Sequence, residues 1–258
     1  MTARSDRALQ DDVIRALADA PFRASAVWRD RRLADPDRVE RYARFLARHF
    51  YYERIVHFFK YSRALARVTG RRPEDVLRTA GFDALLPTLV LGSRATATAV
   101  ARLVTAYLAP GAQSIRYLPD LLRYEEAMMV VEAGPRVWRE PENGKAGSGE
   151  AETPQTVEGT VLLELAYDLP AVLPKLLQPW SEVPRAPERP TRLLIARSPR
   201  GRVSVVRSDA AAAAVVELAD GKRTLADLAA GTGLDVGALQ QTVRDLVDLG
   251  AVRFSTGS

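Results

Sequence analysis

The sequence predicts a mainly α protein, in which an N-terminal helical bundle is followed by a smaller α+β domain. Apolar residues recur every three or four positions through residues 1–139, which is typical of amphipathic helices. Residues 140–158 are rich in Gly, Pro and Glu and almost lack apolar residues, as expected of a flexible linker. In residues 159–258, short β-branched runs precede further helical patterns. These three ranges are the predicted bundle domain, linker and second domain.

The composition excludes several kinds of protein. With 47% hydrophobic and 27% charged residues, the chain has enough apolar surface to form a core. It has no cysteine, which excludes disulfides and zinc ribbons, and its two histidines make a multi-ligand metal enzyme a poor fit. No apolar run approaches the roughly 18 residues of a membrane span, and the N-terminus lacks an apolar signal core. We expect a soluble, cytoplasmic protein without a membrane partner.

The formal net charge of +5 comes mainly from the N-terminal half. Such an excess is compatible with nucleic-acid binding, because phosphates attract basic patches. However, arginines such as Arg38, Arg41, Arg44 and Arg48 recur at helical spacing among apolar residues. This pattern favours solvated helix faces over a nucleic-acid surface.

Proline and capping residues mark where the N-terminal helices begin. Asp35-Pro36-Asp37 supplies an N-cap and a proline at the first helical position, and predicts a long helix over residues 39–68. The other predicted starts are Arg72-Pro73, Ser93 with a helix over 94–108, and Pro119 with a helix ending near Gly134. The residues of the long helix placed for burial are Phe45, Leu46, Phe50, Ile55, Phe58, Phe59 and Leu65.

Residues 159–258 are predicted to form strands and then three short helices. A strand is predicted at 160–167, and the prolines between Pro170 and Pro190 predict an irregular passage. The runs TRLLIAR and RVSVVRS flank Ser198-Pro199-Arg200-Gly201 and predict a hairpin. The predicted helices are Asp209–Leu218, Thr224–Ala230 closed by Gly231, and Val236–Leu249 closed by Gly250, before a last strand, AVRFS. This order is typical of a winged-helix-like module.

Three groups of polar residues in the bundle are candidates for chemistry. His49, Glu53 and His57 share one helix face and can ligate a metal in adjacent pairs, although both histidines cannot bind one ion because eight residues span about 12 Å. Glu125 and Glu126 can act as acid and base. The remaining group is Ser93 and Arg94, which can bind an anion at a helix start.

Structural roles are favoured for all three groups. The His49 group is expected to be a row of polar residues on an aromatic helix, Glu125 or Glu126 to form a salt bridge with an arginine, and Ser93 to cap a helix. The sequence contains no GxGxxG motif after a strand, no P-loop and no plausible Ser-His-Asp set. We therefore expect a protein that is not itself an enzyme.

The winged-helix-like module can bind DNA with its last helix or accept a peptide on its strand edge. The outer faces of helix Val236–Leu249 carry Asp245 and Asp248 against a single arginine, which is a poor surface for DNA. The strand Arg202–Arg207 offers backbone hydrogen-bonding groups, with arginines at both ends for acidic ligand side chains. The charges favour a peptide.

Stretches from both parts of the chain resemble one protein family. HFYYERIVHFFKYSRAL and YLPDLLRYEEA, followed by SDAAAAAVVELADGKRTLADLAAGTGLDVGALQQTVRDLVDLGAVRF, resemble partner proteins of multinuclear non-haem iron-dependent oxidative enzymes. These enzymes take part in the biosynthesis of ribosomally made, post-translationally modified peptides (RiPPs). The last stretch also looks like a PqqD-like RiPP recognition element.

The resemblance implies a non-catalytic partner subunit that forms a heterodimer or larger hetero-oligomer with the iron enzyme. It would bind the leader of a precursor peptide and present the core for oxidation, with the iron in the partner enzyme and no cofactor in this chain. The peptide-binding residues that it implies are Arg202, Val203, Val205, Arg207, Gln240, Val243, Arg244 and Val247. The alternative is a winged-helix DNA-binding transcriptional regulator.

Overall fold

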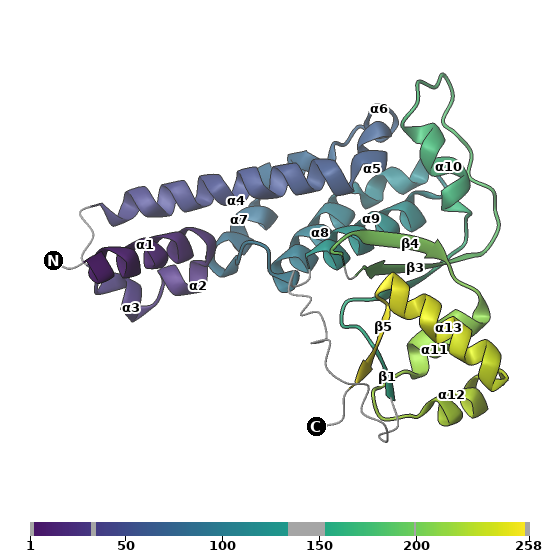
Figure 1. Ribbon diagram of the computed structural model, residues 1–258. Helices are drawn as coiled ribbons and strands as arrows, with labels where there is room; N and C mark the ends of the chain where they lie inside the picture. Colours follow the sequence, from purple (N-terminus) through teal and green to yellow (C-terminus); the bar gives the residue numbers. More distant parts are fainter. Residues whose placement is uncertain (1–2, 32–34, 134–152, 199, 256–258) are drawn as a thin grey trace. The chain divides into compact units, whose positions relative to one another are not determined.

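A computed structural model describes residues 3–31, 35–133, 153–198 and 200–255. These residues are mainly helical with a small amount of sheet, as predicted. The chain forms two compact units (Figure 1), each described separately below. The N-terminal unit comprises Met1–Met129 with Leu176–Val183, and the C-terminal unit comprises Val130–Lys175 with Pro184–Ser258. Most of the predicted linker lies outside the described residues.

The N-terminal unit consists of α-helices and short 3-10 helices. In chain order they are α1 (Ala3–Ala18), α2 (Ala20–Arg23), α3 (Ala26–Arg29), α4 (Pro36–Phe58), α5 (Lys60–Ala64), α6 (Ala66–Thr69), η1 (Pro73–Arg78), α7 (Ala80–Leu85), η2 (Leu86–Thr88), α8 (Arg94–Leu108), η3 (Ala109–Gln113) and α9 (Leu118–Glu132). The predicted cap of α8 is confirmed, because Ser93 Oγ accepts a hydrogen bond from Thr96 N at 3.2 Å. The helix predicted after Arg72 is a short 3-10 helix, and Arg72 offers it no side-chain cap.

The long helix α4 begins as predicted but ends earlier. Asp35 caps it by accepting a hydrogen bond from Arg38 N at 2.8 Å. The prediction of one helix to Val68 is wrong, because the helix is interrupted at Phe59 and again at Leu65. At the first break, a side chain from α9 takes the backbone N–H groups that a continuous helix would direct to its own carbonyls.

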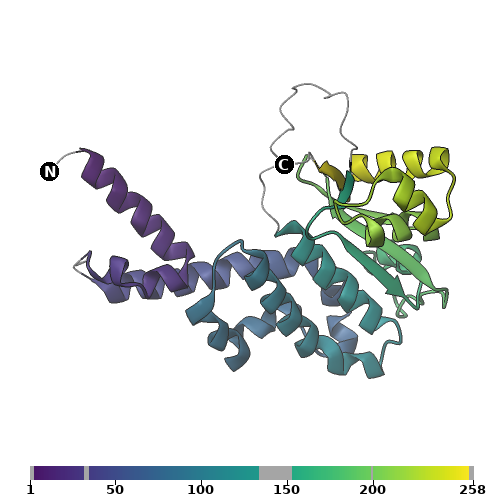
Figure 2. The same cartoon turned by 90° about the horizontal axis from the view of Figure 1, so that it is seen from below.

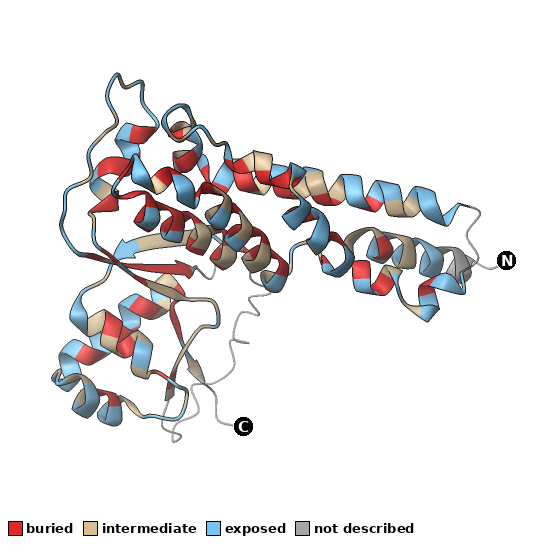
Figure 3. Cartoon of the chain, turned by 180° about the vertical axis from the view of Figure 1, so that it is seen from behind, coloured by how far each residue is buried: buried red, intermediate tan, exposed pale blue. Residues whose placement is uncertain are grey.

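The buried side of α4 differs in part from the predicted one. Ile55, Phe58, Phe59 and Leu65 are buried as predicted, and Figure 3 shows that burial increases along α4. Phe45, predicted to be buried, is 61% exposed. The buried residues of α4 are Ala43, Ala47, Tyr51, Ile55 and Phe58. Phe45 is two positions from Ala43, so it lies about 200° around the helix and faces the other way.

The C-terminal unit contains two small sheets and four helices among the described residues. In chain order its elements are β1 (Thr153–Thr156), β2 (Val161–Leu165), α10 (Leu169–Leu176), β3 (Thr191–Arg197), β4 (Val203–Arg207), α11 (Ala210–Leu218), α12 (Leu225–Thr232), α13 (Val236–Leu249) and β5 (Val252–Ser255). The antiparallel sheet β2-β3-β4 contains the predicted hairpin, and β5 pairs with β1. The predicted linker therefore ends in a strand.

The passage after Pro170 is irregular beyond Leu176, as predicted, but it begins with the short helix α10. Pro170 lies in the first turn of this helix, where a missing N–H costs little, Pro174 lies inside it, and four of its apolar residues are buried. These are Leu169, Val172, Leu173 and Leu176. The helix α12 ends at Gly233 in the left-handed conformation and not at Gly231.

The three last helices cover one face of the sheet β2-β3-β4 (Figure 2). Leu194 and Ala196 of β3 are fully buried against the helices, together with Val215, Leu228 and Leu239. A three-stranded sheet followed by three packed helices is the context of the candidate site.

Candidate functional site

A groove of about 430 Å³ lies between β4 and α13 in the C-terminal unit. Residues from β3, β4, the following turn, α11 and α13 line it: Leu194, Val206, Arg207, Ser208, Asp209, Ala212, Thr242, Asp245, Leu246 and Leu249. The groove therefore lies between the strand and the helix that carry the peptide-binding residues implied by the resemblance.

The strand β4 borders this groove with one open edge. It pairs with β3 on one side, and among the described residues no strand pairs with its other side. Ser208 N donates to Arg192 O at 3.0 Å, and Ser198 N donates to Arg202 O at 2.7 Å. Hydrogen-bonded pairs alternate along an antiparallel ladder, so Ser204 and Val206 direct their backbone groups to β3.

The backbone groups of the intervening residues, Val203, Val205 and Arg207, point to the open edge by the same alternation. An extended ligand strand can therefore add to β4 through the N–H and C=O groups of these residues. The side chains of Val203 and Val205 lie on the face of the sheet away from the groove, because Val205 pairs with Ile195 whereas Val206 pairs with Leu194 on the helix-facing side.

The groove combines an apolar floor with acidic residues. Val206 is 40% exposed and lies opposite the fully buried Leu194. Leu246 and Leu249 supply further apolar surface from α13. Asp209 and Asp245 are both exposed, and each also has a local partner: Asp209 accepts from Ala212 N at 2.8 Å, and Asp245 accepts from Gln241 Nε2 at 2.8 Å.

Of the eight residues implied by the resemblance, only Arg207 lines the groove. Arg202 is exposed and directly precedes β4, and Val203 and Val205 contribute through the backbone geometry described above. On α13, Gln240 and Arg244 are exposed outside the groove.

The remaining two, Val243 and Val247, pack in or against the core. The groove face of α13 carries Thr242, Leu246 and Leu249, which are spaced by four and three residues. This spacing is visible in the sequence, but the spacing alone does not say whether Leu246 belongs to the core or to the groove. It contributes to both, because it is 3% exposed and lines the groove.

Arg207 already has a partner within the protein. Its guanidinium and that of Arg189 both donate to Asp168, a residue that is 1% exposed. Burial on its own raises the pKa of Asp168, but the hydrogen bonds and charges of Arg207 and Arg189 hold this pKa below its usual value. The side chain of Arg207 therefore forms an ion pair with Asp168 and is poorly placed to bind an acidic ligand.

The histidines and Glu53 of α4 form no enclosed site. His49, Glu53 and His57 are all exposed, and His49 stacks on Phe45 with ring centroids 6.2 Å apart. Within the described residues, no group of three or more His, Cys, Asp or Glu side chains is placed to hold a metal ion.

The two adjacent glutamates of α9 have different environments. Glu126 forms the predicted salt bridge, with Arg102 at 3.8 Å, and accepts from Thr105 Oγ1 at 3.0 Å. Glu125 is fully buried and accepts from Tyr61 N at 2.8 Å, from Ser62 N at 3.2 Å and from Ser62 Oγ. Burial raises the pKa of Glu125 to about 8, against the lowering effect of these hydrogen bonds and of Lys60. The predicted salt bridge to an arginine is therefore made by Glu126, the second of the two glutamates.

Comparisons with known proteins add no family assignment: no protein-family model matches the chain, and no curated protein matches it. Among the described residues, no helix combines the length and the apolar character needed to cross a membrane.

Proposed function

We propose that this chain is a non-catalytic partner subunit that binds the leader of a ribosomally made precursor peptide and presents the core to a multinuclear iron-dependent oxidative enzyme. The single observation that carries the peptide-binding part is the open edge of β4 beside an apolar groove. An open strand edge provides main-chain hydrogen bonds for an added strand, and a groove next to it provides side-chain selectivity.

The proposed ligand is an extended segment that pairs with Val203, Val205 and Arg207 through its backbone. Every second ligand side chain then points toward α13, where Val206 and Leu246 offer an apolar contact. Asp209 and Asp245 border the same groove, so basic ligand side chains beside the apolar one are favoured. This differs from the acidic ligand suggested by the arginines of the sequence.

The enzyme-presenting part of the proposal rests on the sequence resemblance to partner proteins of iron-dependent oxidases. A leader bound in the C-terminal unit leaves the core segment free for a second protein, and the iron chemistry then belongs to that protein. Co-expression with the genes beside it tests this part. Recovery of a stoichiometric complex that contains iron supports it, and isolation of the chain alone under mild salt contradicts it.

The test of peptide binding uses a fluorescein-labelled leader peptide from a precursor encoded beside this chain. Val205→Pro removes an N–H that points to the open edge, without removing a hydrogen bond to β3, so the sheet is expected to persist. The matched control, Val205→Ala, keeps that N–H. Loss of one such hydrogen bond and crowding by the proline ring weaken binding about tenfold or more.

Fluorescence polarisation measures both variants, and circular dichroism checks that they fold. Unchanged affinity in Val205→Pro contradicts strand addition at β4. An equal loss in Val205→Ala points to the valine side chain instead and also contradicts it.

The winged-helix DNA-binding alternative predicts retention of duplex DNA at about 50 mM salt and steep loss as salt rises. Asp245 and Asp248 are exposed on α13 beside Arg244, so this helix presents more acid than base to a phosphate backbone. DNA retention without peptide binding would replace the peptide proposal with this alternative.

A further inference from the structure

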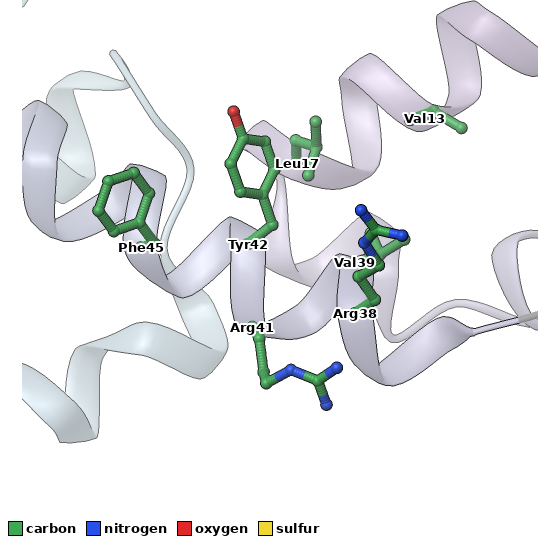
Figure 4. A pocket seen from close by; sticks show the side chains of 7 residues that line it. All are labelled: Val13, Leu17, Arg38, Val39, Arg41, Tyr42 and Phe45. Carbon is green, nitrogen blue, oxygen red and sulfur yellow. The ribbon is translucent and has the colours of Figure 1, made fainter.

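A second groove, of about 590 Å³, lies between α1 and α4 of the N-terminal unit. Val13 and Leu17 of α1 line it together with Val39, Tyr42 and Phe45 of α4. Figure 4 shows the Tyr42 ring next to Leu17, and Phe45 further along α4. No part of the proposed peptide-binding function uses this surface.

The aromatic residues of the groove form an exposed row along α4. Phe45 is 61% exposed and Tyr42 is 52% exposed. Phe45 stacks on Tyr42 with ring centroids 6.2 Å apart and an interplanar angle of 18°, and on His49 at 6.2 Å and 3°. These residues are spaced by three and four positions, so they form a stripe separate from the buried face of α4. Exposed, pre-ordered aromatic rings of this kind mark interaction surfaces.

The border of the groove is basic. Arg38 and Arg41 line it, and none of its described lining residues is acidic. The side chain of Arg41 is 69% exposed and lies 3.8 Å from Asp35. Two acids of α4 lie near these arginines in the sequence: Asp37 is exposed in the first turn, and Glu40 is paired with Arg23 at 2.7 Å and with Arg44 at 2.8 Å. From Arg41 to Tyr52 the helix contains three arginines and no acid, so the groove attracts negative charge.

We infer that this groove binds an amphipathic helix of a partner protein, with apolar residues on one face and acidic residues beside them. A groove between two helices accepts the apolar stripe of a third helix. Acidic flanks on that helix complement Arg38 and Arg41. A second copy of this chain fits less well, because a symmetric contact brings the same arginines together from both copies.

The experiment uses the full chain and two synthetic helices of about 18 residues. Both carry leucines three and four positions apart; one has glutamates on the flanking positions, and its twin has lysines there. We expect the glutamate helix to bind at least about tenfold more tightly than the lysine helix. Phe45→Ser is expected to abolish this binding, and Arg41→Glu to reverse the preference.

Both substitutions lie at exposed positions, so folding is expected to persist. Val236→Ser, at an apolar residue that is 53% exposed in the C-terminal unit, is the control and should bind like the parent chain. Binding of both helices with equal affinity, or unchanged binding by Phe45→Ser, overturns the inference. A dimer in sedimentation that Phe45→Ser dissociates would overturn it in favour of a second copy. Val205→Pro should leave this binding unchanged, which separates this test from that of the peptide proposal.

Discussion

Glu125 accepts hydrogen bonds from both the backbone N–H and the side-chain hydroxyl of Ser62, which lies 63 residues earlier in the chain. It also accepts from Tyr61 N at 2.8 Å. The helix α5 has no side-chain cap from its own sequence. Glu125 therefore acts as a remote N-cap, and its carboxyl group occupies the place that carbonyls of α4 would take in an unbroken helix.

The burial of Glu125 predicts that the protein loses stability as the pH rises. Its pKa is about 8 in the folded protein against an ordinary value of 4.5. Between these values the unfolded chain releases the proton and the folded chain keeps it, so the free energy of unfolding falls by up to about 1.4 kcal/mol per pH unit. The free energy of unfolding begins to fall as the pH rises above 4.5, and it stops falling above the folded-state pKa of about 8.

Glu125→Gln keeps the shape of the protonated acid and removes this titration. Urea unfolding of both proteins at pH 5, 6.5 and 8.5 measures the difference. We expect the stability of the parent chain relative to the variant to fall across this range. Parallel profiles would show that Glu125 is not the group responsible.

The break between α4 and α5 shows what the sequence could and could not predict. Starts such as those of α4 and α8 depend on residues within three positions, Asp35 with Arg38 and Ser93 with Thr96, and both were predicted. The break at Phe59 depends on the carboxyl group of Glu125 in α9. No local pattern encodes a contact over more than 60 residues, so periodicity alone extended the helix to Val68.

In the candidate groove, too, the features set by nearby residues were predictable and those set by contacts between distant residues were not. The hairpin, the helix Val236–Leu249 and its closing Gly250 follow from local signals, and the structure contains all three. Which side of β4 faces α13 depends on the register with β3, where Val206 lies opposite Leu194. A strand's two faces differ by one residue, and the peptide-binding residues that the resemblance implies include Val205 but not Val206, which lines the groove.

Two glycines that close helices provide a matched prediction about stability. Gly233 and Gly250 have φ angles of +70° and +82°. A Cβ at Gly233 meets nothing within 4 Å, whereas one at Gly250 would lie 2.3 Å from Arg197 O. Gly233→Ala should cost about 1 kcal/mol from the left-handed backbone, and Gly250→Ala more than about 3 kcal/mol because the backbone of Arg197 must also move.

Chemical unfolding of the two alanine variants measures this difference. Equal losses would contradict the close approach of α13 to the β3–β4 turn.

Asp168 predicts a second pH-dependent contribution to stability, which is lost at low pH. Its buried carboxylate accepts from Arg189 and Arg207. Asp168→Asn should lower the free energy of unfolding by about 1–3 kcal/mol at pH 7. The paired arginines lower the pKa of Asp168, so its contribution is present above the ordinary value of 3.8 and is lost as the pH falls through the lowered value.

Urea unfolding at pH 7 and pH 3 should therefore show a smaller difference between variant and parent at the lower pH. Glu164→Gln is the control, because the Glu164 side chain is 71% exposed where it pairs with Arg192 and such pairs contribute less than about 1 kcal/mol. A control as destabilised as Asp168→Asn would contradict the special position of Asp168.

Asp245 predicts the charge preference of the proposed peptide groove. It lines the groove, whereas Asp248, one turn along α13, is exposed outside it. Two labelled peptides of about eight residues test this, one with lysines and one with glutamates flanking a central leucine. A partly exposed charge pair contributes up to about 1 kcal/mol, so the parent chain should prefer the lysine peptide by up to about fivefold at low salt.

Asp245→Lys should reverse this preference, because the substitution places a positive charge on the groove side of α13. Asp248→Lys changes the net charge equally but should leave the preference unchanged. If both variants reverse it to the same degree, the preference comes from the overall charge of the domain and not from the groove. If neither does, the ligand does not lie against α13, and strand addition at β4 would have to act without side-chain selection by this helix.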